Sequence, residues 1–553
     1  MKKGKMVITV FTAIGVTLLP AYAAAKPQAT IEYRTFDGSN NNEDYPDWGK
    51  SDIAFLRLAG VGYADGYNKP AGSHRPSARI ISNLIAIQYQ SILNQAKASD
   101  FFWQWGQFLD HDMDLTPEQT PPEPFDIPVP KGDPYFDPDG TGKQVIDLNR
   151  SAYKIDQYSV RQQLNFDTAF IDASNVYGSD ATRAAALRTF SGGKLKTSAG
   201  DLLPFNTDGL ANAGGTAANL FLAGDVRANE QIALTCVHTL FMREHNRLCD
   251  EIAGSNPNLT DEEIYQMARK IVGAFAQHIT YYEFLPLLLG QGAVPLYHGY
   301  DSQANPGIAT EFATAAYRFG HSMLSPNLLL AYGSGKSSLT PFKMFPPRMI
   351  QTDKAGNLSS LALQDCFFDP ALISGDYDID CFLKGLTLQQ AQELDNKVVD
   401  AVRNFLFGQP GAGGFDLVSL NIQRGRDHGL PDYNSVRKAY HLTPKRSFSE
   451  VTSNPEVQSQ LAQAYKSVDD MDLWVAGLAE DHLLGALVGE TFRTILIDQF
   501  TRLRDGDRFW YQNDPFFTSN PGLMKQVEST TLSDILKRNT KVGWIQGDVL
   551  IVP

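Results

Sequence analysis

Cysteine is scarce in this chain: its 553 residues include only Cys236, Cys249, Cys366 and Cys381. So few cysteines exclude a small scaffold stapled by disulfides, and stability must therefore come from a buried core. Cys236 and Cys249 are 13 residues apart in a segment that reads as one helix, about 20 Å along its axis, which is too far for a bridge. Cys366 and Cys381 flank a Gly/Asp-rich loop at 374–378, and the sequence leaves open whether they pair or remain free thiols.

The chain also lacks an excess of basic residues. It has 48 Lys and Arg against 62 Asp and Glu, a formal net charge of −14. Loss of residues 1–25, which contain three lysines and no acidic residue, would take this charge to −17. A chain this acidic is repelled by polyanions, so we predict that neither nucleic acid nor an anionic membrane is a partner.

Long hydrophobic runs are absent beyond the N-terminus, so no membrane span is predicted. At the N-terminus, Lys2, Lys3 and Lys5 precede an apolar stretch at 6–19 and small residues at 21–25. The apolar stretch is shorter than the roughly 20 residues that a span needs, and the whole pattern is typical of a secretory signal peptide. We expect cleavage after residue 25 and a secreted or periplasmic protein.

No low-complexity tract, fixed-period repeat or Gly/Ser/Pro linker divides the chain. The sequence therefore predicts one large, mainly α domain over residues 26–553, with few short strands. Residues 26–80 read as an irregular N-terminal arm, and 117–150 as a long Pro/Asp/Gly-rich loop. Apolar residues at helical spacing predict helices at 83–94, 99–111, 230–253, 261–283, 308–324, 386–407, 456–466 and 486–504.

Gln107, Asp110 and His111 are the most informative group of residues. Positions i, i+3 and i+4 share one face of a helix, so these three side chains are predicted to point the same way. The helix is rich in aromatic residues, and burying an amide, a carboxylate and an imidazole there is costly unless each has a partner. A large redox cofactor would supply partners; the alternative is a structural core histidine beside a capping aspartate.

Further segments carry similar groups. Arg227 and Glu230 stand at i and i+3 where a helix starts, which is also a common arrangement for a surface salt bridge. His321 ends an alanine-rich apolar segment, where a neutral imidazole could ligate a metal or simply be a core residue. Further on, Asn421 could accept a hydrogen bond from such a histidine, and Arg424 could neutralise carboxylates of a buried cofactor.

The loop near residue 170 offers oxygen ligands. If it is extended, alternate residues face one way and present hydroxyl, backbone carbonyl, carboxylate and hydroxyl oxygens from Thr168, Phe170, Asp172 and Ser174. Such a set suits Ca²⁺, while the alternative is a polar turn.

Five strings of residues occur in an order that resembles one family. They are WGQFLDHD (105–112), DTAFIDASNVYGS (167–179), HTLFMREHNRL (238–248), YRFGHS (317–322) and LNIQRGRDHGLP (420–431). On these strings the chain resembles the animal-type haem peroxidases of the peroxidase–cyclooxygenase superfamily, and looks like a bacterial, single-domain member. The resemblance runs from about residue 30 to the C-terminus and implies a single helical haem-peroxidase domain.

The resemblance also implies roles for individual residues. The matching positions are His111, Gln107 and Arg227 as catalytic residues on the distal side of the haem, Asp110 and Glu230 as the acids that form ester links to it, His321 as the proximal iron ligand, Asn421 as the amide that orients this ligand, and Arg318 and Arg424 as arginines near the haem propionates.

A second set of positions matches the family's calcium ligands. The resemblance implies that Asp112, Thr168, Phe170, Asp172 and Ser174 bind Ca²⁺. The cofactors implied are thus haem b, ester-linked where the two acids react, and Ca²⁺.

The activity implied is reduction of hydrogen peroxide and oxidation of small anions (iodide, thiocyanate and bromide) and aromatic donors through a ferryl intermediate. Gln231 departs from the myeloperoxidase pattern, in which a methionine forms a sulfonium link to the haem. A glutamine cannot make that link, so we expect little oxidation of chloride.

Two alternative functions remain open at this stage. Fatty-acid dioxygenases of the same superfamily carry a radical tyrosine three residues before the proximal histidine, whereas here Tyr317 stands four residues before His321. The second alternative is an adhesion or binding protein in the manner of peroxinectins, because Lys131-Gly132-Asp133 is an integrin-type tripeptide. Such a tripeptide also arises by chance in a Pro/Gly/Asp-rich loop.

Overall fold

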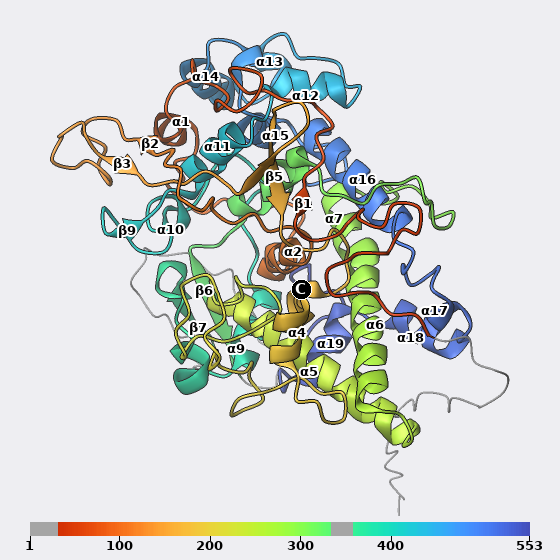
Figure 1. The fold of residues 1–553 in the computed structure, drawn as a ribbon. Coiled ribbons are helices and arrows are strands. Elements are labelled where there is room, and N and C mark those ends of the chain that lie inside the picture. The colour runs from red at the N-terminus through yellow and green to blue at the C-terminus, as the bar shows by residue number, and fades with distance from the viewer. Residues whose placement is uncertain (1–30, 333–357) are drawn as a thin grey trace, which may run out of the picture.

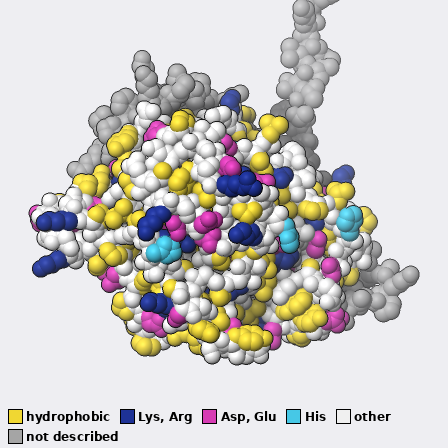
Figure 2. All heavy atoms as spheres, turned by 90° about the horizontal axis from the view of Figure 1, so that it is seen from above, with side chains coloured by type: hydrophobic (Ala, Val, Ile, Leu, Met, Phe, Trp, Pro, Cys, Tyr) yellow, Lys and Arg dark blue, Asp and Glu magenta, His cyan; other side chains and the backbone are white. Residues whose placement is uncertain are grey.

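The computed structural model describes residues 31–332 and 358–553, which are mainly helical with small sheets, as the sequence predicts (Figure 1). The expected signal peptide at 1–25 lies outside the described residues. Within these two ranges, no helix is both long enough and apolar enough to cross a membrane. On the face shown in Figure 2, basic and acidic side chains are interspersed, so neither sign forms a continuous field there.

The α-helices follow one another along the chain as α1 (Ala78–Ile85), α2 (Asp100–Met113), α3 (Ser174–Tyr177), α4 (Ala181–Leu187), α5 (Ile232–Ser255), α6 (Asp261–Ile279), α7 (Leu285–Leu289), α8 (Thr310–Thr314), α9 (Ile379–Leu388), α10 (Asp400–Arg403), α11 (Leu417–Asp427), α12 (Tyr433–Ala439), α13 (Phe448–Val451), α14 (Pro455–Ala464), α15 (Leu473–Ala479), α16 (Glu490–Asp505), α17 (Pro515–Thr518), α18 (Pro521–Ser529) and α19 (Leu532–Asn539). A π-helical turn, Thr280–Phe284, joins α6 to α7, and a 3₁₀ helix, Ala316–Ser322, follows α8.

The strands are short and form separate small sheets: β1 (Ile53–Ala54), β2 (Ile127–Pro128), β3 (Val145–Ile146), β4 (Tyr153–Ile155), β5 (Arg161–Asn165), β6 (Asn327–Ala331), β7 (Leu358–Ala362), β8 (Gln409–Pro410) and β9 (Gly413–Gly414). Strands β1, β5 and β4 make an antiparallel sheet in that order. Strand β1 and the start of α1 lie in the predicted irregular arm, and β2 pairs with β3 inside the predicted loop 117–150, so both segments contain more structure than expected.

Several predicted helices are present with small shifts at their ends. They are 99–111 (α2), 230–253 (α5), 261–283 (α6 and the π turn), 456–466 (α14) and 486–504 (α16). The predicted helix at 308–324 is divided instead, because Ala315 leaves helical geometry (φ −139°, ψ −70°) between α8 and the 3₁₀ helix. The break matters because His321 lies on the tighter 3₁₀ part.

The predictions at 83–94 and 386–407 are wrong over most of their length. Helix α1 ends at residue 85 and α9 at residue 388, and the chain beyond each is irregular, with isolated β-bridges. The two irregular segments pair with each other, so some of the backbone groups that a helix would satisfy internally are satisfied between the segments. The bonds run from Asn94 N to Ala391 O (3.1 Å), Glu393 N to Ile92 O (2.6 Å) and Val398 N to Ala86 O (3.0 Å).

Helix α2 lies inside the hydrophobic core and packs against α5 and α9. Trp105 and Phe108 of α2 contact Phe241 of α5, with ring centroids 5.7 and 4.9 Å apart. These rings bury one side of α2, which fixes the rotation of the helix and the direction of its polar face.

All four cysteines are buried free thiols. Cys366 Sγ donates to the carbonyl of Ala362 (3.3 Å) and Cys381 Sγ to that of Asp378 (2.9 Å). The alternative left open by the sequence is therefore settled in favour of thiols, and the core holds the fold without cross-links.

Candidate active site

The polar face of α2 carries the predicted group, and His111 lies at its centre. Its imidazole is only 4% exposed; Nδ1 lies 3.4 Å from Asp225 Oδ1, and Nε2 lies 4.0 Å from Glu230 Oε2. Burial, together with the positive charge of Arg227, lowers the pKa of His111 well below its ordinary value. The imidazole is therefore neutral near pH 7 and able to accept a proton.

Arg227 is held by carboxylates just before α5. Its guanidinium donates to Asp225 Oδ2 (2.9 Å) and Asp167 Oδ2 (3.0 Å), and Nη1 lies 3.6 Å from Asp110 Oδ2. Although burial opposes ionisation, Arg227 and His111 hold the pKa of Asp225 well below its usual range. The positive charge of Arg227 thus has a fixed place beside His111.

Sequence reasoning missed Asp225 and Asp167. Asp225 stands two residues before Arg227, so its position beside a candidate catalytic arginine was visible in the sequence. Asp167 is 60 residues from Arg227, and only the fold brings the two together. Asp225 positions both Arg227 and His111, whereas Asp167 positions Arg227.

The two acids predicted to form ester links both lie near His111: Asp110 precedes it in α2, and Glu230 Oε2 lies 4.0 Å from its Nε2. The side chains of Asp110 and Glu230 are 29% and 22% exposed. Burial raises the pKa of both carboxyls, that of Glu230 to about 7. Gln107 donates to Glu230 Oε2 through Nε2 (3.3 Å), so the predicted distal glutamine belongs to the same group.

Gln231 is buried at the start of α5 and has two functions in this region. Its Oε1 accepts from the backbone N–H of Ala233 (2.8 Å), which caps the helix. Its Nε2 donates to Gln107 Oε1 (3.2 Å) and also to Gln104. Gln231 therefore sets the orientation of the Gln107 amide on the polar face of α2.

On the other side of α2, the 3₁₀ helix carries His321 to α11. Asn421 Nδ2 lies 2.7 Å from His321 Nδ1, and Arg318 donates to Asn421 Oδ1 (3.1 Å). Burial and the nearby Arg318 lower the pKa of His321 to about 3, so the ring is neutral. As placed, Asn421 donates to Nδ1 through Nδ2 rather than accepting from the histidine as the sequence predicts, and the ring proton then lies on Nε2. Binding of a metal through Nε2 requires the other amide orientation, in which Asn421 Oδ1 accepts from Nδ1–H.

Arg424 lies apart from this pair. Its Nη1 donates to the carbonyl of Asn149 (2.9 Å), to Ser151 Oγ (2.8 Å) and to Asp427 Oδ2 (3.0 Å). Of the two arginines predicted near propionates, only Arg318 contacts a residue of the His321 group.

The five predicted calcium ligands are brought to one place at the end of α2. Asp112 Oδ2 accepts from the backbone N–H of Asp172 (3.1 Å), and Asp112 Oδ1 accepts from Ser174 Oγ (2.8 Å). Thr168 Oγ1 donates to Asp172 Oδ1 (3.2 Å), while Asp172 Oδ2 is buried without a partner. Phe170 is buried in the same loop.

Two buried carboxyls, those of Asp112 and Asp172, meet at this place. Burial and the negative Asp172 raise the pKa of Asp112 to about 7, and burial raises that of Asp172. A cation would relieve this repulsion. In the part of the chain that the structure describes, no cluster of three or more His, Cys, Asp or Glu side chains forms a metal site, so this one would depend on hydroxyl and carbonyl oxygens.

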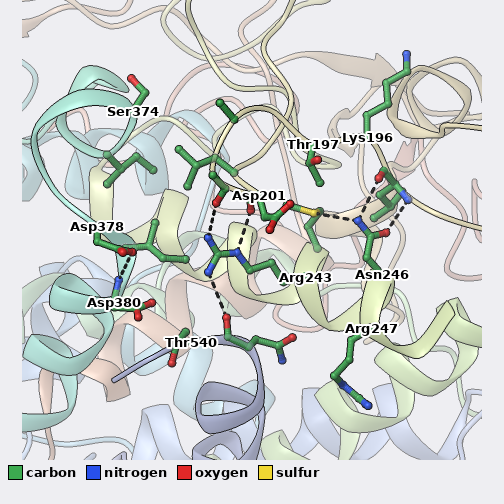
Figure 3. Close-up of a pocket in the computed structure, with 18 of the residues that line it drawn as sticks. Lys196, Thr197, Asp201, Arg243, Asn246, Arg247, Ser374, Asp378, Asp380 and Thr540 are labelled. Atoms are coloured by element: carbon green, nitrogen blue, oxygen red, sulfur yellow. Dashed lines mark hydrogen bonds between the residues drawn. The ribbon is translucent and has the colours of Figure 1, made fainter. Parts of the chain in front are cut away.

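A large surface groove lies elsewhere and is lined by none of the predicted site residues (Figure 3). It has a volume of about 1390 Å³. Arg243 lies at the centre of the groove, and its guanidinium donates hydrogen bonds to the backbone carbonyls of Gly200 (2.9 Å), Asp201 (2.9 Å) and Asn539 (3.2 Å). Arg243 is 12 residues beyond Gln231, the residue that caps the same helix, which is about 18 Å along the helix axis. The groove is therefore separate from the site around His111.

Comparison with known proteins identifies the class. The family model described as animal haem peroxidase matches residues 33–550, so the chain belongs to the animal haem peroxidase family, as its sequence strings indicate. It is a haem peroxidase, an oxidoreductase.

The chain is similar to Peroxinectin A of Dictyostelium discoideum, with 36% identity over 94% of this chain and 95% of that protein. It is 34% identical to peroxidasin of Drosophila melanogaster and to the human peroxidasin homolog, but spans only 35% and 37% of their lengths. Among solved structures, Peroxidase A from Dictyostelium discoideum superposes with a TM-score of 0.84 at 34% identity, covering 94% of this chain and 99% of that one. The fatty acid alpha-dioxygenase of Arabidopsis thaliana shares the fold alone (TM-score 0.77, 21% identity, covering 94% of this chain and 83% of that one).

The residues present fit a haem. His321 is a neutral imidazole held at Nδ1 by the Asn421 amide, and with Asn421 Oδ1 turned to accept from Nδ1–H its Nε2 would suit an axial ligand. Asp110 and Glu230 keep exposed carboxyl surface near His111, and Arg318 supplies a positive charge next to the proximal pair. These groups are costly to bury alone and would be satisfied by a bound macrocycle with charged edges.

The structure bears on the adhesion motif. Asp133 of the Lys131-Gly132-Asp133 tripeptide is buried, and its carboxylate is bound by Arg79 Nε (2.8 Å) and Asn83 Nδ2 (2.8 Å). The tripeptide therefore does not present its acid to a partner.

Proposed function

We propose that this protein reduces hydrogen peroxide at a haem held between α2 and the 3₁₀ helix, and that it oxidises small anions and aromatic donors. The observation that carries the proposal is the pair of buried, neutral imidazoles: His111 beside Arg227, and His321 held by Asn421. When bound, the haem supplies the redox-active iron at which peroxide is reduced.

His111 acts as the proton carrier. As a neutral imidazole it takes the proton from one peroxide oxygen and returns it to the oxygen that leaves as water. Arg227 stabilises the negative charge that develops on the departing oxygen, and Asp225 keeps the guanidinium from turning away. Gln107 offers its amide N–H to a water or an anion on the same side.

Asp110 and Glu230 form ester links to the haem. Their raised pKa values support this, because a carboxyl that stays protonated is less costly to convert into a neutral ester than a stabilised carboxylate. After repeated turnover with peroxide the haem should resist extraction into acid butanone, and replacing both acids with Asn and Gln should make it extractable. Complete extraction from the unmodified protein would exclude the esters.

Ca²⁺ binds Asp112, Thr168, Phe170, Asp172 and Ser174. Asp112 directly follows His111, so an ion there would fix the loop against the distal helix. The repulsion that Asp172 exerts on the buried carboxyl of Asp112 supports the ion.

Residues 1–25 direct the chain out of the cytoplasm, to the periplasm or the exterior. The basic and apolar N-terminus supports export.

The anions that the protein oxidises are iodide, thiocyanate and bromide. Gln231 caps α5 and donates a hydrogen bond to Gln107, and it stands where a methionine could form a sulfonium link to the haem. Without that link, the oxidising power of the haem stays below that needed for rapid oxidation of chloride.

The test uses the haem-loaded protein, its optical spectrum with and without peroxide, and the rate of oxidation of each halide. We expect a haem spectrum that changes with peroxide, and iodide and thiocyanate turnover that exceeds chloride turnover. His111→Gln should slow peroxide reduction by orders of magnitude, while His298→Gln, on a loop outside the site, should not. A haem protein that leaves peroxide unconsumed would overturn the proposal, and equal chloride and bromide rates would overturn the anion preference.

A further inference from the structure

A row of aromatic side chains leads away from the 3₁₀ helix. The ring of Tyr317 lies 5.7 Å from that of Phe500 on α16, and Phe500 lies 6.1 Å from Tyr281 in the π turn after α6. Tyr281 in turn packs edge-on against Trp510 at 4.8 Å. Electrons move between side chains most easily over short steps, and these centroid spacings keep every step within ring contact.

The row continues to the surface. Trp510 lies 5.0 Å from Tyr511, Tyr511 lies 6.0 Å from His278, and His278 stacks on Tyr282 at 4.6 Å. Tyr282 is 53% exposed. Figure 1 shows α6, which carries His278, and α16, which carries Phe500, on the same side of the molecule.

Two of the buried phenols in the row, Tyr281 and Tyr511, have hydrogen-bond acceptors. Tyr281 donates to the carbonyl of Phe500 (2.5 Å), and the Tyr511 hydroxyl lies 3.2 Å from His278 Nδ1. Burial lowers the pKa of His278 to about 4, so the ring is neutral and can take the proton that an oxidised phenol releases. Oxidation of a tyrosine is costly unless its proton leaves with the electron, and at Tyr511 the neutral His278 ring removes that obstacle.

The inner end of the row lies beside the candidate active site. Tyr317 stands four residues before His321, and its hydroxyl is buried with no hydrogen-bond partner in the described structure. Burial and the neighbouring Asp110 and Asp114 raise its pKa well above the ordinary value, so the phenol is neutral next to the distal acids. An unpartnered buried hydroxyl is unusual, so the hydroxyl of Tyr317 calls for an explanation beyond the packing of its ring.

The geometry points to a second oxidation site at Tyr282, where phenolic donors attached to macromolecules are oxidised by electron transfer through Trp510, Tyr281 and Tyr317. This inference rests on the peroxidase chemistry proposed above, which supplies the oxidant. Each phenol gives one electron and one proton, the Tyr282 radical regains both, and two such steps convert one hydrogen peroxide into two waters. The products are two phenoxyl radicals, which couple with each other.

The donor class follows from access. His111 is 4% exposed, so a phenol on a bulky carrier cannot approach it, whereas Tyr282 is open to solvent. Tyr282 also lines a surface groove of about 1170 Å³, together with Pro286, Leu287 and the exposed Leu484. Apolar groups beside an exposed tyrosine favour contact with an aromatic donor.

The first experiment locates the radical. The haem-loaded protein receives hydrogen peroxide with a nitrone spin trap and no donor, and the trapped site is mapped by peptide mass spectrometry. We expect the adduct on Tyr282. The matched control residue is Tyr158, which is 71% exposed and lies outside the row. An adduct on Tyr158 at the same level as on Tyr282 would overturn the inference, because exposure alone would then explain trapping.

The second experiment measures turnover of dextran-linked tyramine against iodide. Tyr282→Phe and the interior variant Tyr281→Phe should each lower oxidation of the dextran-linked phenol about tenfold while iodide oxidation is unchanged. Tyr158→Phe should alter neither rate. Unchanged turnover of the carrier-linked phenol in Tyr282→Phe would refute the second site, whereas failure of iodide oxidation in the unmodified protein would refute the proposed peroxidase function instead.

Discussion

His111 and His321 are both neutral because they are buried beside an arginine, yet the structure gives them different neighbours. His111 has carboxylates on both sides and an arginine charge beyond them. His321 has a neutral amide on Nδ1 and no carboxylate among the described contacts of its ring. The carboxylates stabilise a protonated imidazole, so His111 suits proton transfer, whereas the amide leaves His321 suited to a metal.

The proximal assignment yields a direct prediction at this scale. His321→Ala should lose the haem, or retain it with a peroxidase rate lower by orders of magnitude, because no other imidazole contacts Asn421 in the described structure. The measurements are the haem-to-protein absorbance ratio and peroxide turnover. His298→Ala serves as the control and should bind haem normally; a five-coordinate ferric spectrum retained by His321→Ala would contradict the assignment.

At the scale of elements, the loop 167–174 and α2 form one unit. Asp112 accepts hydrogen bonds from the backbone of 172–175, so the end of the distal helix and the loop move together. His111 lies next to Asp112, and the same connection would carry a change in the loop to the haem.

Removal of calcium tests this connection. Treatment with a chelator should lower the melting temperature by several degrees and shift the haem spectrum, because an ion that binds only the folded state stabilises it. Asp112→Asn should bind Ca²⁺ weakly and respond little to the chelator. A protein purified with no calcium and insensitive to chelation would contradict the site.

The contact between α9 and β6 gives a second prediction at this scale. A Cβ on Gly385 would lie 1.7 Å from the carbonyl oxygen of Leu329, which is a backbone atom that cannot turn aside. Gly385→Ala should therefore lower the free energy of unfolding by about 1–3 kcal/mol, as overpacking does in other cores. Gly375→Ala is the control, since nothing lies within 4 Å of its Cβ position. Equal denaturation midpoints for the two variants would show that the helix and strand can separate freely.

At the scale of the whole molecule, the dependence of stability on pH is set by buried acids whose pKa is lowered and by buried acids whose pKa is raised. Arg79, Asn83 and backbone N–H groups outweigh burial at Asp133 and hold its pKa well below the ordinary value, so its contribution is lost as the pH falls below about 4. Burial raises the pKa of Asp100 and of Glu283 to about 8. Their folded values exceed the unfolded ones, so their contribution is present below about pH 4 and is lost as the pH rises through 8.

We therefore expect the melting temperature to fall between pH 6 and pH 9. Asp100→Asn should reduce that fall by several degrees, because the amide keeps an acceptor for Ser325 Oγ and cannot ionise. The experiment compares thermal unfolding of both proteins at the two pH values. A fall of equal size in both would show that Asp100 does not ionise over this range.

The sequence by itself determined the family, the helices α2, α5, α6, α14 and α16, and most of the residues of the candidate site. These features depend on local information: apolar spacing fixes which face of a helix is buried, and the five strings carry their own residue types. Whether Asp110, Glu230 and the calcium set act as the strings imply remains a prediction.

Only the tertiary structure decided the rest. Residues 87–94 and 390–398 have helical patterns, but their backbone groups bond to each other instead, an outcome that depends on a partner about 300 residues away in the chain. Asp167 meets Arg227, and Asp133 is withdrawn from the surface by Arg79, for the same reason. A residue's partners across the fold are set by how elements pack, and no local spacing in the chain carries that information.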